Sequence, residues 1–369
     1  MNFGYLNIIG LMTGTSMDGI DISLVRTNGV DLKRQRQNYF YKFSDKTREC
    51  LLSITKQNFE DTYERKKFLD DLITEEHYRA IIETGLVKKC DLIGFHGQTI
   101  YHNPDEKISY QLGDAKLLNQ LTKKKIIYNF RENDIKSGGD GAPLVPLFHQ
   151  LIATQEKIVL PVCILNIGGI SNITIVNQQT GSEDLLSKDI GPGNCLIDKW
   201  IRNNSNKKYD SNGDLAHRGI KNEIILEQAQ ELYANRLNKQ KRSFDVNDFD
   251  ISFARGLSLV DGVRTLTDFT ANIIGEELEL CISKNNDQIK SIITCGGGRK
   301  NKFLMNKIQE FLGSSIRLKL IDDFNIDGDF VESKAFAFLA VRSYEKMPIS
   351  FPKTTGCLKS CTGGEVIEN

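Results

Sequence analysis

Two glycine-containing stretches, GTSMDGID at residues 14–21 and NIGGISN at residues 166–172, decide the fold of this sequence. Each lies between two runs of apolar and β-branched residues, a pattern that predicts a β-hairpin with small residues in its turn. Such a turn lets consecutive backbone N–H groups converge on a phosphate, and the hydroxyls of Thr15, Ser16 and Ser171 would add donors. Taken singly, each stretch is more simply explained as an ordinary tight turn.

A third stretch, CGGGRKN at residues 295–301, changes this interpretation. It follows a short apolar run and precedes a helical pattern at 303–312, so its backbone can approach an anionic or flat ligand closely. Two phosphate-type hairpins followed by strand–GGG–helix is the order of the actin/hexokinase-like fold, in which the turns hold the phosphates and the GGG loop borders the adenosine. The sequence lacks GxxxxGK[ST], which excludes a P-loop.

The expected fold is therefore α/β, a two-lobe actin/hexokinase-like (ribonuclease H-like) duplicated fold with an interlobe active-site cleft. A chain of 369 residues is long enough for two lobes. We expect an N-terminal lobe at 1–129 plus 345–369 with the first phosphate loop. The second lobe, 130–344, would hold the second phosphate loop, the catalytic Asp and the adenosine loop.

Composition excludes several partners. Lys+Arg and Asp+Glu both number 48, so no basic field exists for nucleic acid or an anionic membrane. The N-terminus lacks the form of a signal peptide, and no stretch approaches the roughly 18 apolar residues of a membrane span. We expect a cytoplasmic protein that binds small molecules.

Other segments predict elements around these motifs. A strand at 91–95 should deliver HGQT at its end, and helices are expected at 262–283 and 333–347. The polar, charged stretch 205–250, with a helical piece at 220–237, resembles a solvated insertion. The eight cysteines are scattered and are expected to be reduced thiols; Cys357 and Cys361 could be redox-active or bind metal, but two thiols are a weak signal.

The stretch SKDIGPGN at 187–194 supplies the candidate base. Asp189 precedes a Gly-Pro-Gly turn that could hold a carboxylate in a loop facing a cleft, and a helix starting near Asn194 would attract an anion. A capping or turn aspartate is an equally simple interpretation. Phosphoryl transfer nevertheless needs one carboxylate to accept a proton from the nucleophile, and Asp189 is the best-placed candidate.

Two further stretches could contact a sugar. In FRENDIKSGGDGAPLVP, at 130–146, Arg131 could anchor a carboxylate or phosphate and Asp134 a hydroxyl. In HGQT, His96 and Gln98 offer donors and acceptors, although a histidine at a strand end is more often structural.

Read in order, GLMTGTSMDGID, GFHGQTIYH, FRENDIKSGGDGAPLVP, LNIGGISNI, KDIGPGN with IDKW, and ITCGGGRKN resemble the anhydro-N-acetylmuramic acid kinase family along nearly the whole chain. Enzymes of that family cleave the 1,6-anhydro bridge of their sugar and phosphorylate O6 with ATP, yielding N-acetylmuramic acid 6-phosphate for cell-wall (peptidoglycan) recycling. The resemblance implies ATP and Mg²⁺ as cofactors, Asp189 as the base that deprotonates water, and a homodimer. It also implies that Glu332, in VESKAFAF, closes the active site.

The resemblance also assigns the binding residues. The nucleotide would contact Gly14, Thr15, Ser16, Met17, Asp18, Gly19, Ile20, Asp21, Gly168, Gly169, Gly296, Gly297, Gly298 and Asn301. The sugar would contact His96, Gln98, Arg131, Asp134 and Asn194.

Two residues depart from the family pattern. Ile190 replaces the usual Thr after the catalytic Asp, and Asp140 adds a negative charge near the place expected for an anionic lactyl group. Two alternatives therefore stay open. One is a kinase for another anhydrosugar, such as levoglucosan, and the other is a nucleotide-binding regulator of the same fold.

Overall fold

The computed structural model describes residues 4–56, 63–178, 184–237, 243–285 and 288–368. The chain folds into two compact units, Met1–Gln155 with Asp329–Asn369, and Glu156–Gly328. These boundaries differ from those expected from sequence, because residues 130–155 and 329–344 belong to the first unit. Helices α5 (Pro146–Gln155) and α11 (Val331–Tyr344) contact each other in that unit, and α11 also packs on its sheet.

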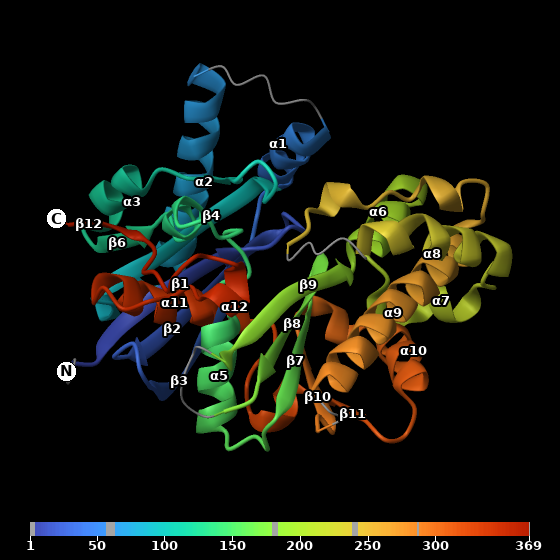
Figure 1. Ribbon diagram of the computed structural model, residues 1–369. Helices are drawn as coiled ribbons and strands as arrows, with labels where there is room; N and C mark the ends of the chain where they lie inside the picture. The colour runs from blue at the N-terminus through green and yellow to red at the C-terminus, as the bar shows by residue number, and fades with distance from the viewer. Residues whose placement is uncertain (1–3, 57–62, 179–183, 238–242, 286–287, 369) are drawn as a thin grey trace. The chain divides into compact units, whose positions relative to one another are not determined.

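The first unit is built on a seven-stranded mixed sheet (Figure 1). Strands β1, β2 and β3 form an antiparallel meander, and β4 and β6 continue the sheet parallel to β1. Strand β12 closes one edge, while β5 pairs with the far part of β4. The strands are β1 (Leu6–Thr13), β2 (Gly19–Thr27), β3 (Leu32–Lys42), β4 (Leu92–Asn103), β5 (Ile108–Leu112), β6 (Lys125–Tyr128) and β12 (Glu365–Ile367).

Helices cover both faces of this sheet. Ile9 and Leu11 of β1 pack into a core with α1 (Asp45–Lys56), α2 (Tyr63–Thr84) and α3 (Ala115–Thr122). Because side chains alternate along a strand, the intervening Gly10 faces the other way, toward α11. There a Cβ on Gly10 would lie 1.9 Å from the Ser333 carbonyl oxygen, so the absence of a side chain lets the helix rest on the sheet.

The second unit repeats this topology in a five-stranded sheet (Figure 1). Its order, β11-β10-β7-β8-β9, matches β6-β4-β1-β2-β3 of the first unit, and the antiparallel and parallel pairings match as well. The strands are β7 (Val162–Ile167), β8 (Ile170–Val176), β9 (Leu186–Pro192), β10 (Ser291–Cys295) and β11 (Arg317–Leu320). The prediction of a duplicated α/β fold is confirmed.

Two helices pack against the second sheet. Apolar residues of β7, β8 and β10 form a core with α9 (Leu259–Lys284) and α10 (Lys302–Leu312), the helices expected after the second hairpin and after the glycine loop. A second core surrounds α9 on its other side. It includes α6 (Cys195–Asn204), α7 (Asp214–Arg218) and α8 (Glu223–Leu237).

The stretch 205–250 is therefore not simply a solvated insertion, as its composition indicated. Leu226, Tyr233 and Phe249 are each at most 4% exposed and belong to this second core. The apolar residues on the buried side of this segment are few and are widely spaced among charged residues. The average composition of the segment is therefore polar, although these residues are buried. Along the described ranges, no helix is both long and apolar enough to cross a membrane.

Candidate functional site

The turn between β1 and β2 exposes the groups expected to bind phosphate. Thr15 and Ser16 are exposed, and a Cβ on Gly14 would contact only its near neighbour Ser16, at 3.6 Å. Met17 adopts a positive φ of 52°, and its amide donates to the Gly14 carbonyl at 3.2 Å. The Ser16 hydroxyl donates to the Asp18 carboxylate at 2.5 Å, so this carboxylate lies within the turn.

Four other residues assigned to this turn contribute less than expected. The side chains of Met17 and Ile20 are buried in the core of the first unit, which leaves only their backbone groups for a ligand. Gly19 and Asp21 already belong to β2, paired with Lys42 and Phe40 of β3.

HGQT lies within β4 rather than at its end, and the strand is irregular there. The register to β1 pairs Leu11 with Phe95 but Thr13 with Gln98, so β4 carries one extra residue. Gly97, with φ of 74°, accommodates this bulge. The Gln98 amide group donates to the Gly14 carbonyl at 3.2 Å, which joins HGQT to the phosphate-type turn.

Gln98 also has an unused acceptor. Its side chain is fully buried, and its Oε1 has no hydrogen-bond partner within the described part of the chain. A buried polar atom without a partner is rare in folded proteins and costs free energy unless a ligand or water satisfies it.

His96 and Arg131 form a pair in the same unit. Arg131 donates to Nε2 of His96 from Nε at 3.2 Å and from Nη2 at 2.9 Å, and its Nη1 donates to the Gly141 carbonyl at 2.8 Å. Burial, together with the Arg131 charge, lowers the pKa of His96 well below its usual value, so the ring is neutral. No sequence pattern indicated this pairing, because 34 intervening positions separate the two residues.

Asp134 does not have the exposed position expected of a sugar ligand. Its side chain, from α4 (Glu132–Lys136), is 0% exposed and accepts hydrogen bonds from the Gly141 amide at 2.7 Å and the Thr355 hydroxyl at 2.6 Å. It therefore supports the loop whose Gly141 carbonyl holds Arg131. Asp140 is not an isolated charge either, since Lys107 Nζ lies 2.7 Å from its carboxylate.

Glu332 lies in the first turn of α11 and is half-buried. Its neighbour Ser333 is buried and shares a hydrogen bond with Ser23 of β2 at 2.7 Å. The position of Glu332 is thus fixed by the packing of α11 on the sheet.

In the second unit, the β7–β8 turn packs against the start of α6. The amides of Gly193 and Asn194 donate to the carbonyls of Gly169 and Gly168 at 2.9 and 2.8 Å. The Asn194 side chain also donates to the Gly168 carbonyl, at 3.1 Å. Helix α6 begins after Asn194, as expected, but the amide side chain of Asn194 holds the turn. Ser171 is fully buried and donates to the Pro192 carbonyl, so its hydroxyl is not an exposed donor.

Asp189 lies on β9, not in a loop, beside a β-bulge. Ser171 pairs with Gly191 but Asn172 pairs with Asp189, so Ile190 is the extra residue. Bulges of this kind re-aim side chains and are over-represented next to active sites. The Ile190 side chain is buried in the core, whereas the Asp189 carboxylate is 8% exposed and accepts the Phe244 amide at 2.8 Å.

The glycine loop after β10 packs on the same β7–β8 hairpin. A Cβ on Gly296 would lie 2.3 Å from the Asn166 side chain, and one on Gly298 would lie 2.2 Å from Ile167. Gly297 has open space at the same position. The turn, the α6 start and the glycine loop therefore meet at one end of this sheet, as the sequence order predicts.

Arg299, which no sequence motif singled out, fixes the glycine loop. It is 6% exposed and binds the Asp322 carboxylate with Nε and Nη2 at 2.6 and 2.9 Å, while Nη1 donates to the Gly296 carbonyl. This pairing lowers the pKa of Asp322. Asn301, assigned to the nucleotide, caps α10 by accepting the Leu304 amide at 3.0 Å.

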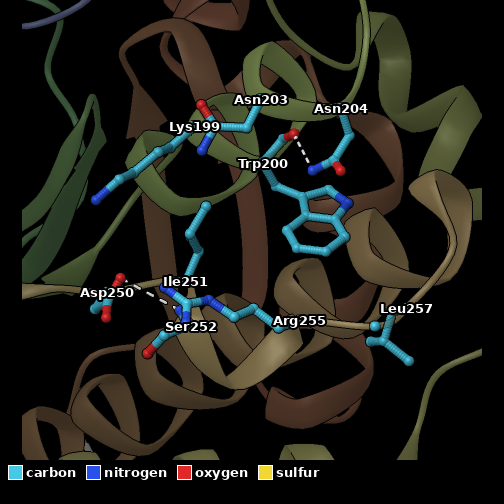
Figure 2. A pocket seen from close by; sticks show the side chains of 10 residues that line it. Lys199, Trp200, Asn203, Asn204, Asp250, Ile251, Ser252, Arg255 and Leu257 are labelled. Atoms are coloured by element: carbon cyan, nitrogen blue, oxygen red, sulfur yellow. Dashed lines mark hydrogen bonds between the residues drawn. The ribbon is translucent and has the colours of Figure 1, made fainter.

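A pocket of about 410 Å³ lies elsewhere in the second unit. Figure 2 shows α6 residues Lys199 and Trp200 on one side and Asp250, Ser252 and Arg255 on the other. None of the site residues predicted from sequence lines it.

A model of the anhydro-N-acetylmuramic acid kinase family matches residues 6–369. The chain belongs to this family. A relative from Pelagibacter ubique, named anhydro-N-acetylmuramic acid kinase, is 46% identical over 98% of this chain and 98% of its own length. Relatives of the same name from Zymomonas mobilis and Brucella canis are 35% and 37% identical, over 97% and 96% of this chain and 98% and 97% of their own lengths.

Among solved structures, the activator of the 2-hydroxyisocaproyl-CoA dehydratase from Clostridium difficile matches 92% of this kinase and 96% of its own chain. Its TM-score is 0.44 and its identity 10%, which adds nothing to the family assignment.

Proposed function

We propose that this kinase hydrolytically opens the 1,6-anhydro ring of 1,6-anhydro-N-acetylmuramic acid and transfers the γ-phosphoryl group of ATP to O6. The product is N-acetylmuramic acid 6-phosphate, and the reaction, which consumes ATP, belongs to cytoplasmic cell-wall recycling. The observation that carries the proposal is the full-length family match, from residue 6 to residue 369. The bulge beside the Asp189 carboxylate in β9 supports it.

Asp189 acts as the general base. Its carboxylate takes a proton from a water molecule as the water oxygen bonds to C1 and the C1–O6 bond breaks. The electron pair left on O6 attacks the γ-phosphorus, and ADP leaves. Ring opening and phosphoryl transfer are complementary steps, because phosphoryl transfer removes the alkoxide that ring opening would otherwise leave.

The two glycine turns bind the phosphates with backbone amides. Gly14–Asp18 offers a turn with exposed hydroxyls, and Gly168–Gly169 offers a second turn held by Asn194. The residues of the first turn also suit Mg²⁺, which takes one or two carboxylates together with phosphate oxygens and water. Asp18, hydrogen-bonded to Ser16, would hold the ion. When bound, Mg²⁺ neutralises charge on the phosphates.

The side chains of Arg131 and Gln98, both in the first unit, bind the sugar. Arg131, oriented by His96 and Gly141, supplies a guanidinium for the lactyl carboxylate. The unsatisfied Oε1 of Gln98 accepts a hydrogen bond from a substrate hydroxyl or bound water. Lys107 offsets the negative charge of Asp140, so this departure from the family pattern is compatible with an anionic sugar.

Asp189→Asn tests the base. The asparagine carbonyl oxygen can still accept the Phe244 amide, so the fold and ATP binding should persist. Loss of the base should lower sugar-dependent ADP release by roughly 10²–10⁴-fold in a coupled assay. Asp214→Asn, an exposed carboxylate on α7, is the matched control and should keep full activity.

The same assay tests the substrate. The unaltered kinase should turn over 1,6-anhydro-N-acetylmuramic acid faster than levoglucosan or N-acetylglucosamine, because only the first offers both an anhydro bridge and a carboxylate. Near-normal turnover by Asp189→Asn would remove this residue from the base role. Preference for levoglucosan would instead replace the proposed sugar while keeping the chemistry.

A further inference from the structure

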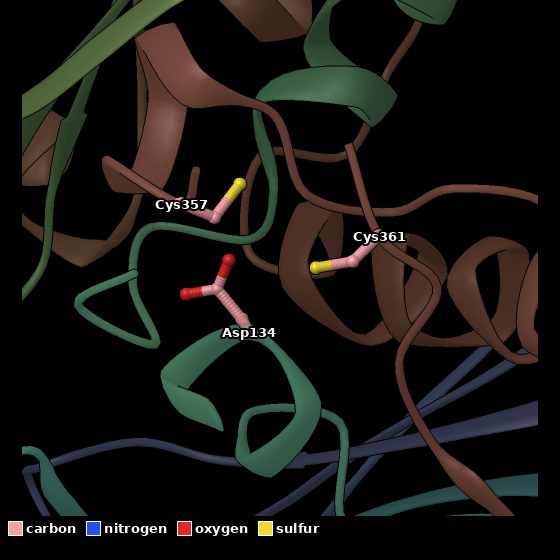
Figure 3. A group of neighbouring side chains, drawn as sticks. All are labelled: Asp134, Cys357 and Cys361. Atoms are coloured by element: carbon pink, nitrogen blue, oxygen red, sulfur yellow. The ribbon is translucent and has the colours of Figure 1, made fainter. Parts of the chain in front are cut away.

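Two cysteines and one aspartate gather in the first unit. Asp134 comes from α4, Cys357 follows α12 (Pro352–Thr355), and Cys361 pairs with Ser350 in an isolated bridge. Figure 3 shows the three side chains near one another, with the Cys361 sulfur directed toward the Asp134 carboxylate. One carboxylate oxygen and the two sulfur atoms all lie within 4.8 Å of one another. The three side chains are 0%, 1% and 9% exposed, in the order given.

The backbone holds these side chains in place before any ligand arrives. The Thr355 hydroxyl binds Asp134, and the Thr355 carbonyl accepts the Asp140 amide at 2.8 Å. The Leu358 amide donates to the Ser137 carbonyl at 2.9 Å. These contacts join the C-terminal segment to α4 and the loop after it, and they place the thiols beside the carboxylate.

Among the described residues, the buried carboxylate of this cluster has no cationic partner. Within the described residues Asp134 forms no ion pair, and its hydrogen-bond donors, the Gly141 amide and the Thr355 hydroxyl, are neutral. Lys107, in the connection between β4 and β5, instead donates to the Asp140 carboxylate and to the carbonyls of Gly138 and Gly139. Buried carboxylates are usually paired with a cation or coordinate a metal.

We propose that Asp134, Cys357 and Cys361 bind one zinc-class divalent cation. Two thiolates and a carboxylate are ligand types that Zn²⁺ accepts, and sulfur ligands favour it over Mg²⁺ or Ca²⁺. Zn–S bonds of about 2.3 Å in a tetrahedron separate two sulfur atoms by roughly 3.8 Å, so small side-chain rotations would close the cluster onto an ion. Water takes the fourth position.

Binding must release protons. Burial raises the pKa of both thiols, to about 11 for Cys357, so both carry protons without a metal. When the ion binds, both S–H bonds break, two Zn–S bonds form, and two protons pass to the buffer. Affinity should therefore fall as pH is lowered. The bound ion would tie α4 to the segment that carries Cys357 and Cys361.

Zinc titration of the reduced, metal-stripped full-length protein tests the site, with a chromophoric chelator as competitor. We expect one Zn²⁺ per chain, release of about two protons per ion, and a higher melting temperature. With Co²⁺ as the probe, a near-ultraviolet sulfur-to-cobalt charge-transfer band should appear.

Two variants separate this site from adventitious thiol binding. Cys357→Ser/Cys361→Ser should abolish stoichiometric binding and the cobalt band, and Asp134→Asn should weaken binding at least about tenfold. Cys163→Ala/Cys281→Ala removes the same number of thiols from another hydrogen-bonded cysteine pair and should leave binding unchanged. Zinc uptake that survives loss of Cys357 and Cys361 would overturn the proposal. So would a reduced protein that takes up no zinc, or a purified chain whose two thiols form a disulfide and bind no metal after reduction.

Discussion

Single buried histidines set how the first unit responds to acid. His77, on α2, is fully buried; its Nδ1 lies 2.7 Å from the Ile73 carbonyl, and its ring edge meets Phe95. Burial lowers its pKa to about 4, and it lowers that of His149, on α5, to about 3. Both rings must stay neutral for the native packing to persist, so protonation favours the unfolded chain.

The pH dependence of stability follows from these shifts. Above pH ~6.5, His77 is neutral in the folded and the unfolded chain, and its contribution is fully present. As the pH is lowered from ~6.5 to about 4, only the unfolded chain binds the proton. The contribution of this residue to the free energy of unfolding therefore falls by about 1.4 kcal/mol for each pH unit. His77→Gln should reduce the slope of the free energy of unfolding against pH by that amount, as measured by urea unfolding at pH values from 7 to 4.5. The exposed His217→Gln is the control, and an unchanged slope in His77→Gln would contradict the argument.

Residue roles were the least predictable part of the site. The sequence correctly indicated that Gly14, Thr15 and Ser16 lie in the turn between β1 and β2. It did not indicate that Asn301 caps α10 by accepting the Leu304 amide. It could not show that Ser171 and Asn194 donate to the backbone carbonyls of Pro192 and Gly168, since these contacts join segments that are not adjacent in the chain. A polar residue type indicates hydrogen-bonding capacity, and only packing decides which partner uses it.

At the level of elements, the contact of α11 with the first sheet fixes Glu332 and covers β1 and β4. Gly10 and Gly94 face this helix, and a Cβ on either would lie 1.9 Å or 2.7 Å from its backbone. Neither glycine has a positive φ, so the requirement is for close approach of two backbones.

Gly10→Ala should therefore destabilise the protein by about 1–3 kcal/mol or more, because the methyl group forces α11 away from β1. Urea unfolding monitored by circular dichroism measures the loss, and activity should fall as well if Glu332 takes part in the reaction. Gly4→Ala is the matched control, since nothing lies within 4 Å of a Cβ there, and it should change stability by at most about 0.5 kcal/mol. Equal stability of both variants would show that α11 tolerates displacement.

Elements with strong periodicity were predicted well. The hairpins, α9 and α11 follow from alternation and helical spacing, and the glycine loop lies between β10 and α10 as expected. The bulges at His96–Gly97 and at Ile190 were not foreseen, because one extra residue in a strand leaves no mark in hydrophobic alternation once both faces are buried.

For the whole molecule, the repeated strand order means that each unit has a sheet and cores of its own. The second unit is a continuous segment, Glu156–Gly328, whereas the first is completed by residues from the end of the chain. Helix α11 and strand β12 both belong to that end, and α11 alone buries ten residues. The chain order thus makes the first unit depend on synthesis of the complete chain, while the second does not.

Fragment 156–328 should therefore fold alone, with a cooperative thermal transition and dispersed amide resonances. Fragment 1–155 should not, because without α11 the face of β1 and β4 that carries Ile8 and Gly10 is open to water. Joining 1–155 to 329–369 by a short flexible linker should restore cooperative unfolding, since it returns α11 and β12 to the sheet.

Dye binding to exposed apolar surface distinguishes the three chains, with the strongest signal expected for 1–155. A cooperative 1–155 fragment, or a 156–328 fragment without fixed packing, would show that the repeated topology does not define independent folding units.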